Sequence, residues 1–448
     1  MMALAFADVI PRLLEVSRDD PMLRRAVRIG VVRDRRGIVR LAVELDQTNE
    51  SERDAVETSL KTALGGWYAG PILRTDANQS SKRLALEILN RAKGQWPESW
   101  PKEVVDPVRG TSTPIDVSRW GAVQRVLSKE TWLAKQSTAS PWPLREQTPT
   151  IVSFYSYKGG VGRSTLVAIV AAILARAGEN VVVVDLDLEA PGQQTLFGAQ
   201  PSRGVIDYVT EHIALGSSDL AGLLIDVTPQ APGAQGTIHL AAAGTVDWSY
   251  VEKISRLDFV AHTEGGNESP VHEALGALLK GVKSDLRPDW VLLDARTGIH
   301  DLGGLAMHAF AHIDVLLGRE GAQSADGLRL CLQALARRRA PEDIRTLIVH
   351  ALAPAPLDDA YSLPIQEAFR NAAYELFKGT VYQPVDDREL PAADDAGAPH
   401  TPYPIPLDPT LGRLETLVSM ADLTLERSYY KAIVRRLREL AEPEEALE

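Results

Sequence analysis

Short apolar runs alternate with longer helix-like stretches through the last two-thirds of the chain. The runs at 150–154 and 181–184 are continuous and rich in β-branched residues, which is typical of strands buried on both faces. The apolar stretch at 166–174 is long enough for a helix directly after the first strand. We predict further strands at 237–240, 290–294, 313–317 and 346–349. This alternation predicts an α/β fold whose mostly parallel sheet carries helices on both faces.

The N-terminal part of the chain has a different pattern. Residues 25–32 and 39–45 alternate apolar and polar positions on either side of a turn, which predicts a β-hairpin with one apolar face. The pattern then predicts a helix over 51–64, a short strand near 72–73 and a helix over 82–92. This ββαβα order predicts a small α+β domain of ferredoxin-like size at 1–93. The domain carries no catalytic constellation, so we expect it to serve recognition of a partner protein.

Residues 94–147 differ in composition from the segments on either side. Prolines and glycines recur in this stretch, which favours a connector. Several tryptophans indicate that the connector packs against another part of the protein. We predict one helix within it, at about 120–135. The connector therefore separates the recognition domain from an α/β domain at 148–448.

Two features stand out near the end of the chain. Residues 354–409 are rich in proline and aspartate, which predicts loops. Within them, residues 402–406 fit either a polyproline segment or ordinary rim loops. A final helix over about 423–442 carries one apolar face, formed by Tyr430, Ile433, Val434, Leu437 and Ala441. An apolar face of this kind favours packing on the core of the domain.

The segment after the first strand of the α/β domain carries the clearest chemistry. It consists of Lys158, Gly159, Gly160, Val161, Gly162, Arg163, Ser164 and Thr165. A glycine-rich turn between a buried strand and a helix collects unpaired backbone N–H groups at the positive end of the helix dipole. Ser164 follows the loop cation Arg163, where a P-loop places the hydroxyl that binds Mg²⁺. The loop therefore predicts nucleotide binding.

This loop departs from the ordinary P-loop pattern but fits the deviant Walker A motif, Lys-Gly-Gly-x-Gly-Lys-[Ser/Thr]. The one difference is that Arg163 replaces the second lysine. On these residues the chain resembles the ParA/MinD group of P-loop ATPases, in particular a subgroup with the sequence Lys-Gly-Gly-Val-Gly-Arg. The resemblance covers the α/β part of the chain and implies ATP and Mg²⁺ as ligands.

Acidic residues end two of the predicted strands. Asp185 and Asp187 follow the run at 181–184, and Asp294 ends the strand at 290–294. Carboxylates at this edge of an open α/β sheet meet bound ligands, although they also cap turns. The resemblance implies that Asp187 orients or activates the attacking water and that Asp185 supports Mg²⁺ or its waters. It also implies that Asp294, as the Walker B residue, holds the Mg²⁺ shell.

Three basic residues bear on catalysis. In the resembled ATPases a lysine at the position of Lys158 reaches across a dimer interface, which implies a nucleotide-dependent homodimer. Arg296 either stabilises charge in the transition state or pairs with Asp301 and only holds its loop. Arg163 retains charge and donors, so nucleotide binding tolerates it. Its guanidinium is larger and planar, so hydrolysis depends on its placement.

Composition narrows the classes of function. The 448 residues are 45% hydrophobic and 24% charged, which fits a soluble protein of two or more domains. The net charge of −12 argues against non-specific DNA binding. The single cysteine, Cys331, argues against a disulfide framework and any CxxC zinc or iron–sulfur site. The chain lacks a long apolar run and a signal-peptide pattern, so we expect a cytoplasmic protein. Acidic residues after the final helix argue against a MinD-like role at membranes.

The leading hypothesis is a switch: ATP with Mg²⁺ closes a homodimer, slow hydrolysis opens it, and the N-terminal domain passes the state to a partner protein. The alternative is a nucleotide-binding scaffold without significant turnover, because Arg163 replaces the lysine. A phosphotransferase lacks support, since no second-substrate site is visible in the sequence. The acidic net charge weighs against a partitioning role on DNA.

Overall fold

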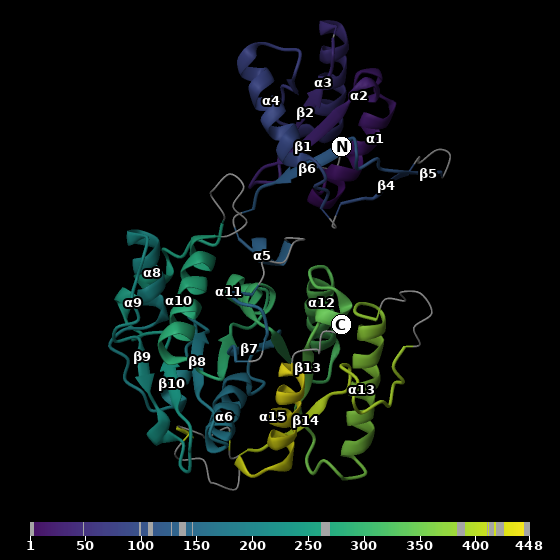
Figure 1. Ribbon diagram of the computed structural model, residues 1–448. Coiled ribbons are helices and arrows are strands. Elements are labelled where there is room, and N and C mark those ends of the chain that lie inside the picture. Colours follow the sequence, from purple (N-terminus) through teal and green to yellow (C-terminus); the bar gives the residue numbers. More distant parts are fainter. Residues whose placement is uncertain are drawn as a thin grey trace, which may run out of the picture. The chain divides into compact units, whose positions relative to one another are not determined.

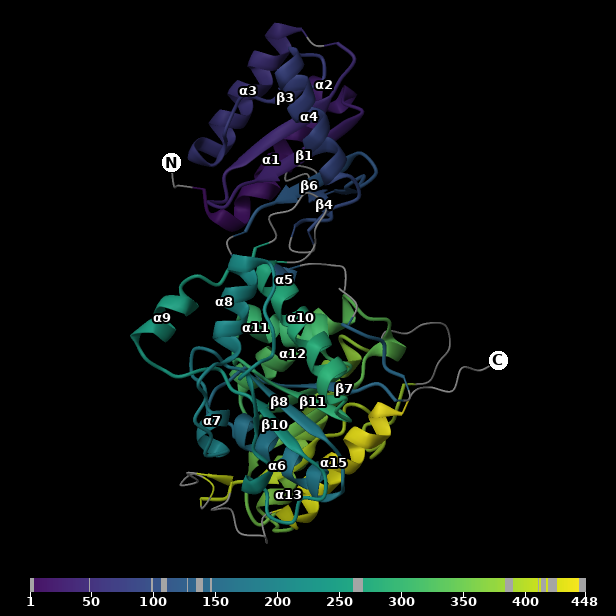
Figure 2. The ribbon, with the colours of Figure 1, turned by 60° about the vertical axis from the view of Figure 1, so that its left-hand side comes forward.

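The computed structural model divides into two compact units, residues 1–127 and 128–448. It describes residues 4–47, 49–97, 100–105, 111–126, 128–133, 140–145, 147–260, 269–382, 390–409, 411, 416–417 and 425–442. Each unit has its own sheet and its own hydrophobic core (Figures 1 and 2).

The first unit is a four-stranded sheet covered by helices. Its strands are β1 (Arg28–Arg33), β2 (Val39–Glu44), β3 (Leu73–Arg74) and β6 (Trp120–Gln124), in the order β3-β2-β1-β6; a separate small pair joins β4 (Glu103–Val105) and β5 (Ser112–Pro114). Its helices are α1 (Val9–Asp19), α2 (Pro21–Arg25), α3 (Glu50–Leu64) and α4 (Gln79–Ala92), with 3₁₀ turns η1 (Phe6–Asp8) and η2 (Gly65–Trp67). The predicted hairpin is present, with β1 and β2 antiparallel. The predicted ββαβα order is also present, preceded by α1 and α2.

The first unit extends well past residue 93, so the predicted boundary is too early. Strand β6 pairs in parallel with β1, and this pairing draws residues up to 127 into the unit. The helix predicted at 120–135 is therefore wrong for its first part, which is a strand. Only α5 (Glu130–Leu133) is helical there, and it belongs to the second unit; residues 134–139 lie outside the described residues. The predicted connector is thus divided between the two units.

The second unit is built on an eight-stranded sheet. Its strands are β7 (Thr150–Ser156), β8 (Val181–Leu186), β9 (Leu224–Asp226), β10 (Ile238–Ala241), β11 (Trp290–Ala295), β12 (Ile313–Gly318), β13 (Thr346–Ala353) and β14 (Tyr403–Pro406). Their order is β14-β13-β12-β7-β11-β8-β10-β9, and every pairing is parallel except that of β9 with β10. The predicted α/β fold with a mostly parallel sheet is confirmed. The continuous apolar runs form the central strands because both of their faces are covered.

Helices cover both faces of this sheet and bury two hydrophobic clusters. On one face lie α6 (Arg163–Arg176) and α15 (Ser428–Ala441), which are side by side (Figures 1 and 2). The other face is covered chiefly by α8 (Val205–Leu215), α10 (Pro270–Leu286), α11 (Asp301–Leu305), the π-helix η4 (Ala306–Phe310), α12 (Ala322–Ala336) and α13 (Ser362–Lys378). Shorter elements are α7 (Gln193–Leu196), α9 (Trp248–Ile254), η3 (Thr228–Gln230) and η5 (Pro341–Asp343).

The C-terminal part departs from the predicted loops but keeps the predicted final helix. The stretch 354–409 is not all loop, because α13 spans seventeen of its residues. Residues 403–406 form β14, an edge strand, instead of a polyproline segment or rim loop. Prolines fit there because an edge strand leaves one row of N–H positions unpaired. The final helix packs on the core as predicted: its residues Tyr430, Ile433, Val434 and Leu437 are buried.

Candidate functional site

The glycine-rich loop joins the end of β7 to the start of α6 at the carboxyl edge of the sheet. Gly160 (φ 72°) and Gly162 (φ 81°) have left-handed backbone conformations that favour glycine. A Cβ atom added at Gly159, Gly160 or Gly162 meets no other atom within 4 Å, so the loop borders open space. Within the described part of the chain, the backbone N–H groups of residues 158–165 donate no hydrogen bond. The loop therefore presents unused donors at a helix N-terminus, as an anion site requires.

The predicted acidic residues converge beside this loop. Asp185 in β8 and Asp294 in β11 are adjacent in the register of the sheet, and both are fully buried. Asp187 lies just past the end of β8 and is also buried. The backbone N–H groups of Asp187, Gly192 and Gln193 donate to Asp185 at 3.0–3.1 Å. Two segments that are distant in sequence thus bring three carboxylates to one place.

Arg163 lies in the middle of these acids. Its Nε donates to Asp294 at 2.5 Å and its Nη2 donates to Asp187 at 2.8 Å. Nη2 is also 3.3 Å from the hydroxyl of Ser164. The side chain is 6% exposed, so its charge is compensated inside the protein. The loop cation is thus turned inward onto two acids, away from the open space in front of the glycines.

Burial and mutual repulsion shape the titration of this cluster. Burial raises the pKa of Asp185, and the neighbouring Asp294 raises it further, while hydrogen bonds from Gln193 and Asp187 oppose the rise. Burial opposes the charge of Arg163, but the attraction of Asp294 and Asp187 outweighs it, so the pKa of Arg163 is raised. The cluster thus keeps Arg163 charged and makes it harder for Asp185 to ionise.

Gln193 is a site residue that the sequence analysis missed. It is fully buried, and its Nε2 donates to the backbone carbonyl of Ser164 at 3.0 Å and to Asp294 at 2.6 Å. One amide therefore joins the start of α6 to the end of β11. Its only signal in the sequence is its position shortly after the Asp185–Asp187 pair, and glutamine there matches no motif.

Arg296 extends the cluster into the loop after β11. Its Nη1 donates to Asp187 at 2.8 Å, and its Nη2 lies 2.8 Å from Glu189. The predicted alternative of a pair with Asp301 is wrong, because Asp301 is bound by Lys129 at 2.7 Å. The other oxygen of Glu189 lies 2.8 Å from Nε2 of His300. Burial lowers the pKa of His300, although Glu189 partly opposes the decrease.

Comparison with known proteins agrees with this geometry. A family model described as ParA, NUBPL iron-transfer P-loop NTPase matches residues 147–216, which include the loop and the Asp185–Asp187 pair. The septum site-determining protein MinD of Helicobacter pylori is 27% identical over 168 residues, 37% of this chain and 51% of that protein. The second unit thus resembles the ParA/MinD group of P-loop ATPases, and we call it the ParA/MinD-like domain.

Two further relatives resemble parts of the ParA/MinD-like domain. An iron–sulfur cluster carrier protein of Aquifex aeolicus is 37% identical over 73 residues, 16% of this chain and 20% of that protein. A ParA family ATPase of Chlorobium tepidum has 18% identity and a TM-score of 0.43, with 65% of this chain and 99% of that chain covered. This chain therefore spans about half or less of the curated relatives that it matches.

The cysteine content differs from what an iron–sulfur site requires. The one cysteine, Cys331, is buried in α12, and burial raises the pKa of its thiol. Clusters of this kind are held by several thiolates, so Cys331 alone does not provide such a site. Among the described residues, no helix combines the length and apolar character needed to span a membrane.

The structure places the remaining predicted site residues around the same loop of the ParA/MinD-like domain. Lys158 is exposed and makes no ion pair within the described segments. Ser164 and Thr165 are half-buried at the start of α6, and the hydroxyl of Ser164 accepts a hydrogen bond from Arg163. Arg163 Nη1 and Gln193 Oε1 are buried and have no hydrogen-bond partner among the described residues. These unpaired atoms fit a site that a polar ligand completes.

The magnesium ligands that we predict, Ser164, Asp185 and Asp294, fit a hard cation because all of them offer oxygen. In the described part of the chain, no group of three or more His, Cys, Asp or Glu side chains is arranged to hold a metal. In other proteins Mg²⁺ is usually held by one or two carboxylates together with water and the phosphates of a substrate.

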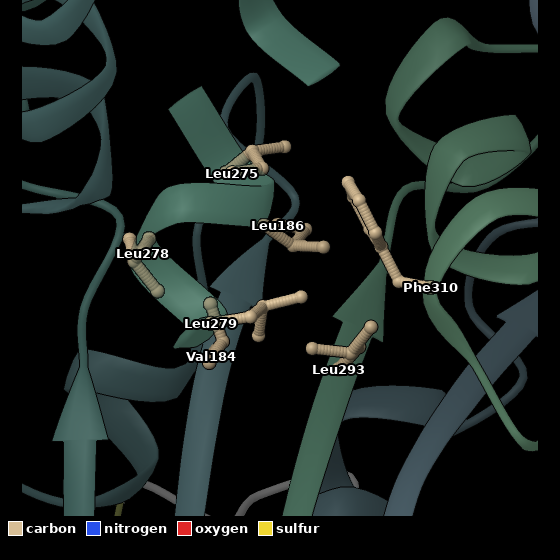
Figure 3. A pocket seen from close by; sticks show the side chains of 7 residues that line it. All are labelled: Val184, Leu186, Leu275, Leu278, Leu279, Leu293 and Phe310. Carbon is tan, nitrogen blue, oxygen red and sulfur yellow. The ribbon is translucent and has the colours of Figure 1, made fainter. Parts of the chain in front are cut away.

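A narrow apolar pocket lies on the other side of the strands that carry the acids (Figure 3). It is lined only by hydrophobic side chains: Val184, Leu186, Leu275, Leu278, Leu279, Leu293 and Phe310. In Figure 3 the side chains of Leu275 and Phe310 extend toward each other beyond the ends of the strands that carry Leu186 and Leu293. A charged nucleotide finds no polar partner there, so we treat this pocket as part of the core.

Proposed function

We propose that the ParA/MinD-like domain binds ATP with Mg²⁺ and hydrolyses it slowly, as a homodimeric switch that signals its nucleotide state to a partner protein. The observation that carries the proposal is the loop at 158–165, whose unused N–H donors lie beside three buried carboxylates. Donors for phosphate and ligands for a cation thus occur together at the edge of the sheet where open α/β folds bind ligands.

Each site residue has a role in this proposal. The loop N–H groups and Arg163 bind the phosphates, and Ser164, Asp185 and Asp294 hold the ion. Bound Mg²⁺ neutralises charge that develops on the phosphate oxygens. Asp187 orients the attacking water. Arg296, which already contacts Asp187, is placed to stabilise charge beside it.

Phosphate binding requires Arg163 to change partners. In the structure its guanidinium is held by Asp187 and Asp294, so it must leave both to reach a phosphate in front of the glycines. Its departure frees Asp187 to accept a hydrogen bond from water and frees Asp294 for the ion. Because breaking buried ion pairs is costly, the exchange slows the switch.

The homodimer and the partner complete the proposal. Lys158 is exposed next to the loop, which supports a role across an interface with a second copy of the chain. The first unit has its own core and sheet, which supports its use as a separate recognition domain for the partner protein.

A specific observation favours one alternative, a nucleotide-binding scaffold with no significant turnover. Arg163 ties up both Asp187 and Asp294, and a guanidinium binds two carboxylates better than the ammonium of lysine does. If the ion pairs persist when nucleotide is bound, then Asp187 stays occupied and water is not oriented.

Three measurements on the purified chain test the proposal: calorimetric titration with ATP and Mg²⁺, phosphate release, and mass in solution with and without nucleotide. The variants are Lys158→Ala and Asp187→Ala, with Lys280→Ala as a control because Lys280 is an exposed lysine on α10. We expect ATP-dependent dimers in wild type, loss of dimers in Lys158→Ala and loss of turnover in both variants.

The outcomes separate the two candidate functions. ATP binding without phosphate release in wild type supports the scaffold. Absence of ATP binding refutes both candidates, because each requires the loop to hold the nucleotide. Equal effects of Lys158→Ala and Lys280→Ala on dimers refute the role of Lys158 in the interface.

A further inference from the structure

A short segment at the start of the second unit contacts the loop that follows Asp294. This α5 segment (residues 128–133) begins directly after the first unit. The backbone N–H of Lys129 donates to Asp301, and its Nζ lies 2.7 Å from the other oxygen of the same carboxylate. Asp301 is almost fully buried and is the first residue of α11. The α5 segment is thus anchored on the loop that carries Arg296.

Trp132 strengthens this anchorage. Its Nε1 donates to the backbone carbonyl of His300 at 2.8 Å, and its ring packs edge-on against His308, with 5.0 Å between centroids. Gly304 in α11 allows this close approach. A Cβ atom there would lie 2.5 Å from the hydroxyl of Thr131 and 2.8 Å from Nε1 of Trp132. The fit leaves no space for a methyl group.

A continuous series of ion pairs leads from this contact back to the nucleotide site. His300 bonds Glu189, Glu189 bonds Arg296, and Arg296 bonds Asp187, each at 2.8 Å. Asp187 is in turn bound by Arg163. The same His300 holds the start of α11, because its Nδ1 accepts the backbone N–H of Leu302 at 3.2 Å. A change at Asp187 therefore reaches the residue whose carbonyl holds Trp132.

The contact is close but incomplete in its hydrogen bonds. The hydroxyl of Thr131 and both ring nitrogens of His308 are buried without a partner among the described residues. Burying an unpaired polar atom costs free energy that is recovered when the atom reaches water. The docked arrangement therefore carries an internal cost, which makes it easier to open than a fully paired interface.

We propose that the α5 segment reports the state of the nucleotide site to the first unit. It is docked while Arg163 holds Asp187, and it is released when Arg163 turns to a phosphate and the series through Arg296 and Glu189 rearranges. The proposal rests on the proposed function and specifies its regulation. Lys129 is only five positions after the end of β6, the last strand of the first unit. Release of the α5 segment therefore lengthens the free linker between the first unit and the ParA/MinD-like domain.

Hydrogen–deuterium exchange of the full chain without nucleotide tests the coupling itself. The variants are Glu189→Gln, which removes the charge between Arg296 and His300, and Gly304→Ala, which adds a methyl group where Trp132 packs. Gly276→Ala is the matched control, since it is a helical glycine whose added Cβ meets nothing within 4 Å. We expect exchange at 128–133 to become about fivefold faster in Glu189→Gln and Gly304→Ala, as for the loss of one contact, and to be unchanged in Gly276→Ala.

Each other outcome overturns the proposal. No acceleration in Gly304→Ala means that the segment is not docked on α11. Acceleration in Gly304→Ala without any in Glu189→Gln means that docking is independent of Glu189 and its ion pairs. Equal acceleration throughout α6 and α10 means that the variants only loosen the whole domain.

A second arm adds ATP and Mg²⁺ to the wild type, with occupancy measured separately by calorimetry. Bound ATP should accelerate exchange at 128–133 by about fivefold or more. Bound ATP that leaves this exchange unchanged overturns the reporter proposal and leaves the proposed function intact. Absence of ATP binding refutes the proposed function and with it the nucleotide trigger, whereas the Glu189→Gln result still decides whether the coupling exists.

Discussion

The ParA/MinD-like domain contains two buried clusters of arginine and aspartate, and they differ in how completely their atoms are paired. The closed cluster consists of Ser153, Asp314 and Arg339. Ser153 donates to Asp314 at 2.5 Å, and Arg339 Nη1 donates to its other oxygen at 2.7 Å. Arg339 Nη2 donates to two backbone carbonyls, that of Met307 within η4 and that of Ala311 directly after it. Each of these groups has a partner within the protein.

The open cluster consists of Arg163, Asp187, Asp294 and Gln193. Arg163 Nη1 and Gln193 Oε1 lack partners among the described residues, and the neighbouring glycines border open space. Both clusters bury an arginine on an aspartate, so residue type alone does not separate structure from function. The difference is that backbone carbonyls complete the closed cluster, whereas the open cluster awaits atoms from outside.

The largest expected effect comes from breaking the closed cluster with Arg339→Met. The variant leaves the carboxylate of Asp314 fully buried with only Ser153 beside it, so we expect a loss of about 3–5 kcal/mol in unfolding free energy. Urea denaturation followed by circular dichroism measures it. Arg337→Met is the control, because Arg337 is exposed and only two positions away. A loss equal to that of the control would contradict a structural role.

The next effect is functional and concerns the open cluster. Arg163→Lys restores the residue of the ordinary deviant Walker A motif and weakens the hold on Asp187 and Asp294. Since positioning errors of about 1 Å cost about a hundredfold in rate, we expect turnover to rise by up to about a hundredfold. Phosphate release at saturating ATP and Mg²⁺ measures the rate, with Arg337→Lys as control. A lower rate would contradict the expectation that the hold of Arg163 on Asp187 and Asp294 limits turnover.

A smaller effect is expected at Gln193. In Gln193→Leu both hydrogen bonds of the amide, to Ser164 and to Asp294, are lost, so the candidate ion ligands are held less firmly. Loss of a residue that orients metal ligands typically weakens metal affinity by about 10–100-fold. Titration of Mg²⁺ in the presence of ATP measures this, and Gln194→Leu serves as the neighbouring control. Equal affinity in the two variants would show that Gln193 does not orient the ligands.

The smallest expected effect is a pH dependence of the free energy of unfolding, caused by His312 near the closed cluster. His312 accepts the backbone N–H of Ile151 and contacts the carbonyl of Trp142; burial lowers its pKa to about 4. The unfolded chain then takes up a proton at higher pH than the folded chain, so stability falls as the pH decreases from about 7 toward 4. Between about pH 7 and pH 5.5 we expect the free energy of unfolding to fall by about 1 kcal/mol. His312→Gln should flatten the curve in urea denaturation, and an identical slope in both proteins would refute this assignment.

The sequence predicts the phosphate loop and the three acids because their signals are local. Glycines, a buried strand and the start of a helix are consecutive, and parallel strands bring their carboxyl ends to one edge whatever lies between them. The inward turn of Arg163 was not predictable, since it depends on distances between side chains of α6, β8 and β11. Gln193 was missed for a related reason, because an amide becomes a site residue only through the partners that the fold gives it.

Errors in the predicted fold have the same origin. Strand β6 joins β1 from far along the chain, and no local pattern marks that pairing, so the first unit was ended too early. Helix α13 lies inside a stretch whose prolines and aspartates suggested loops. The apolar residues of α13 recur every three to four positions, as a helix requires. The prolines and aspartates of the surrounding stretch nevertheless led to a prediction of loops. The early boundary of the first unit thus comes from a long-range strand pairing. The missed helix comes from judging a long stretch by its overall composition.

The short edge strands of the large sheet bear on how this protein avoids aggregation. One edge is β14, in which prolines at 404 and 406 remove N–H donors, and the other is the three-residue strand β9. Such edges offer a poor template for a strand from another chain. Copies of this protein that meet while crowded or partly unfolded are therefore discouraged from joining sheet to sheet. Pro404 and Pro406 thus reduce aggregation through this edge of the sheet whether or not ATP is bound.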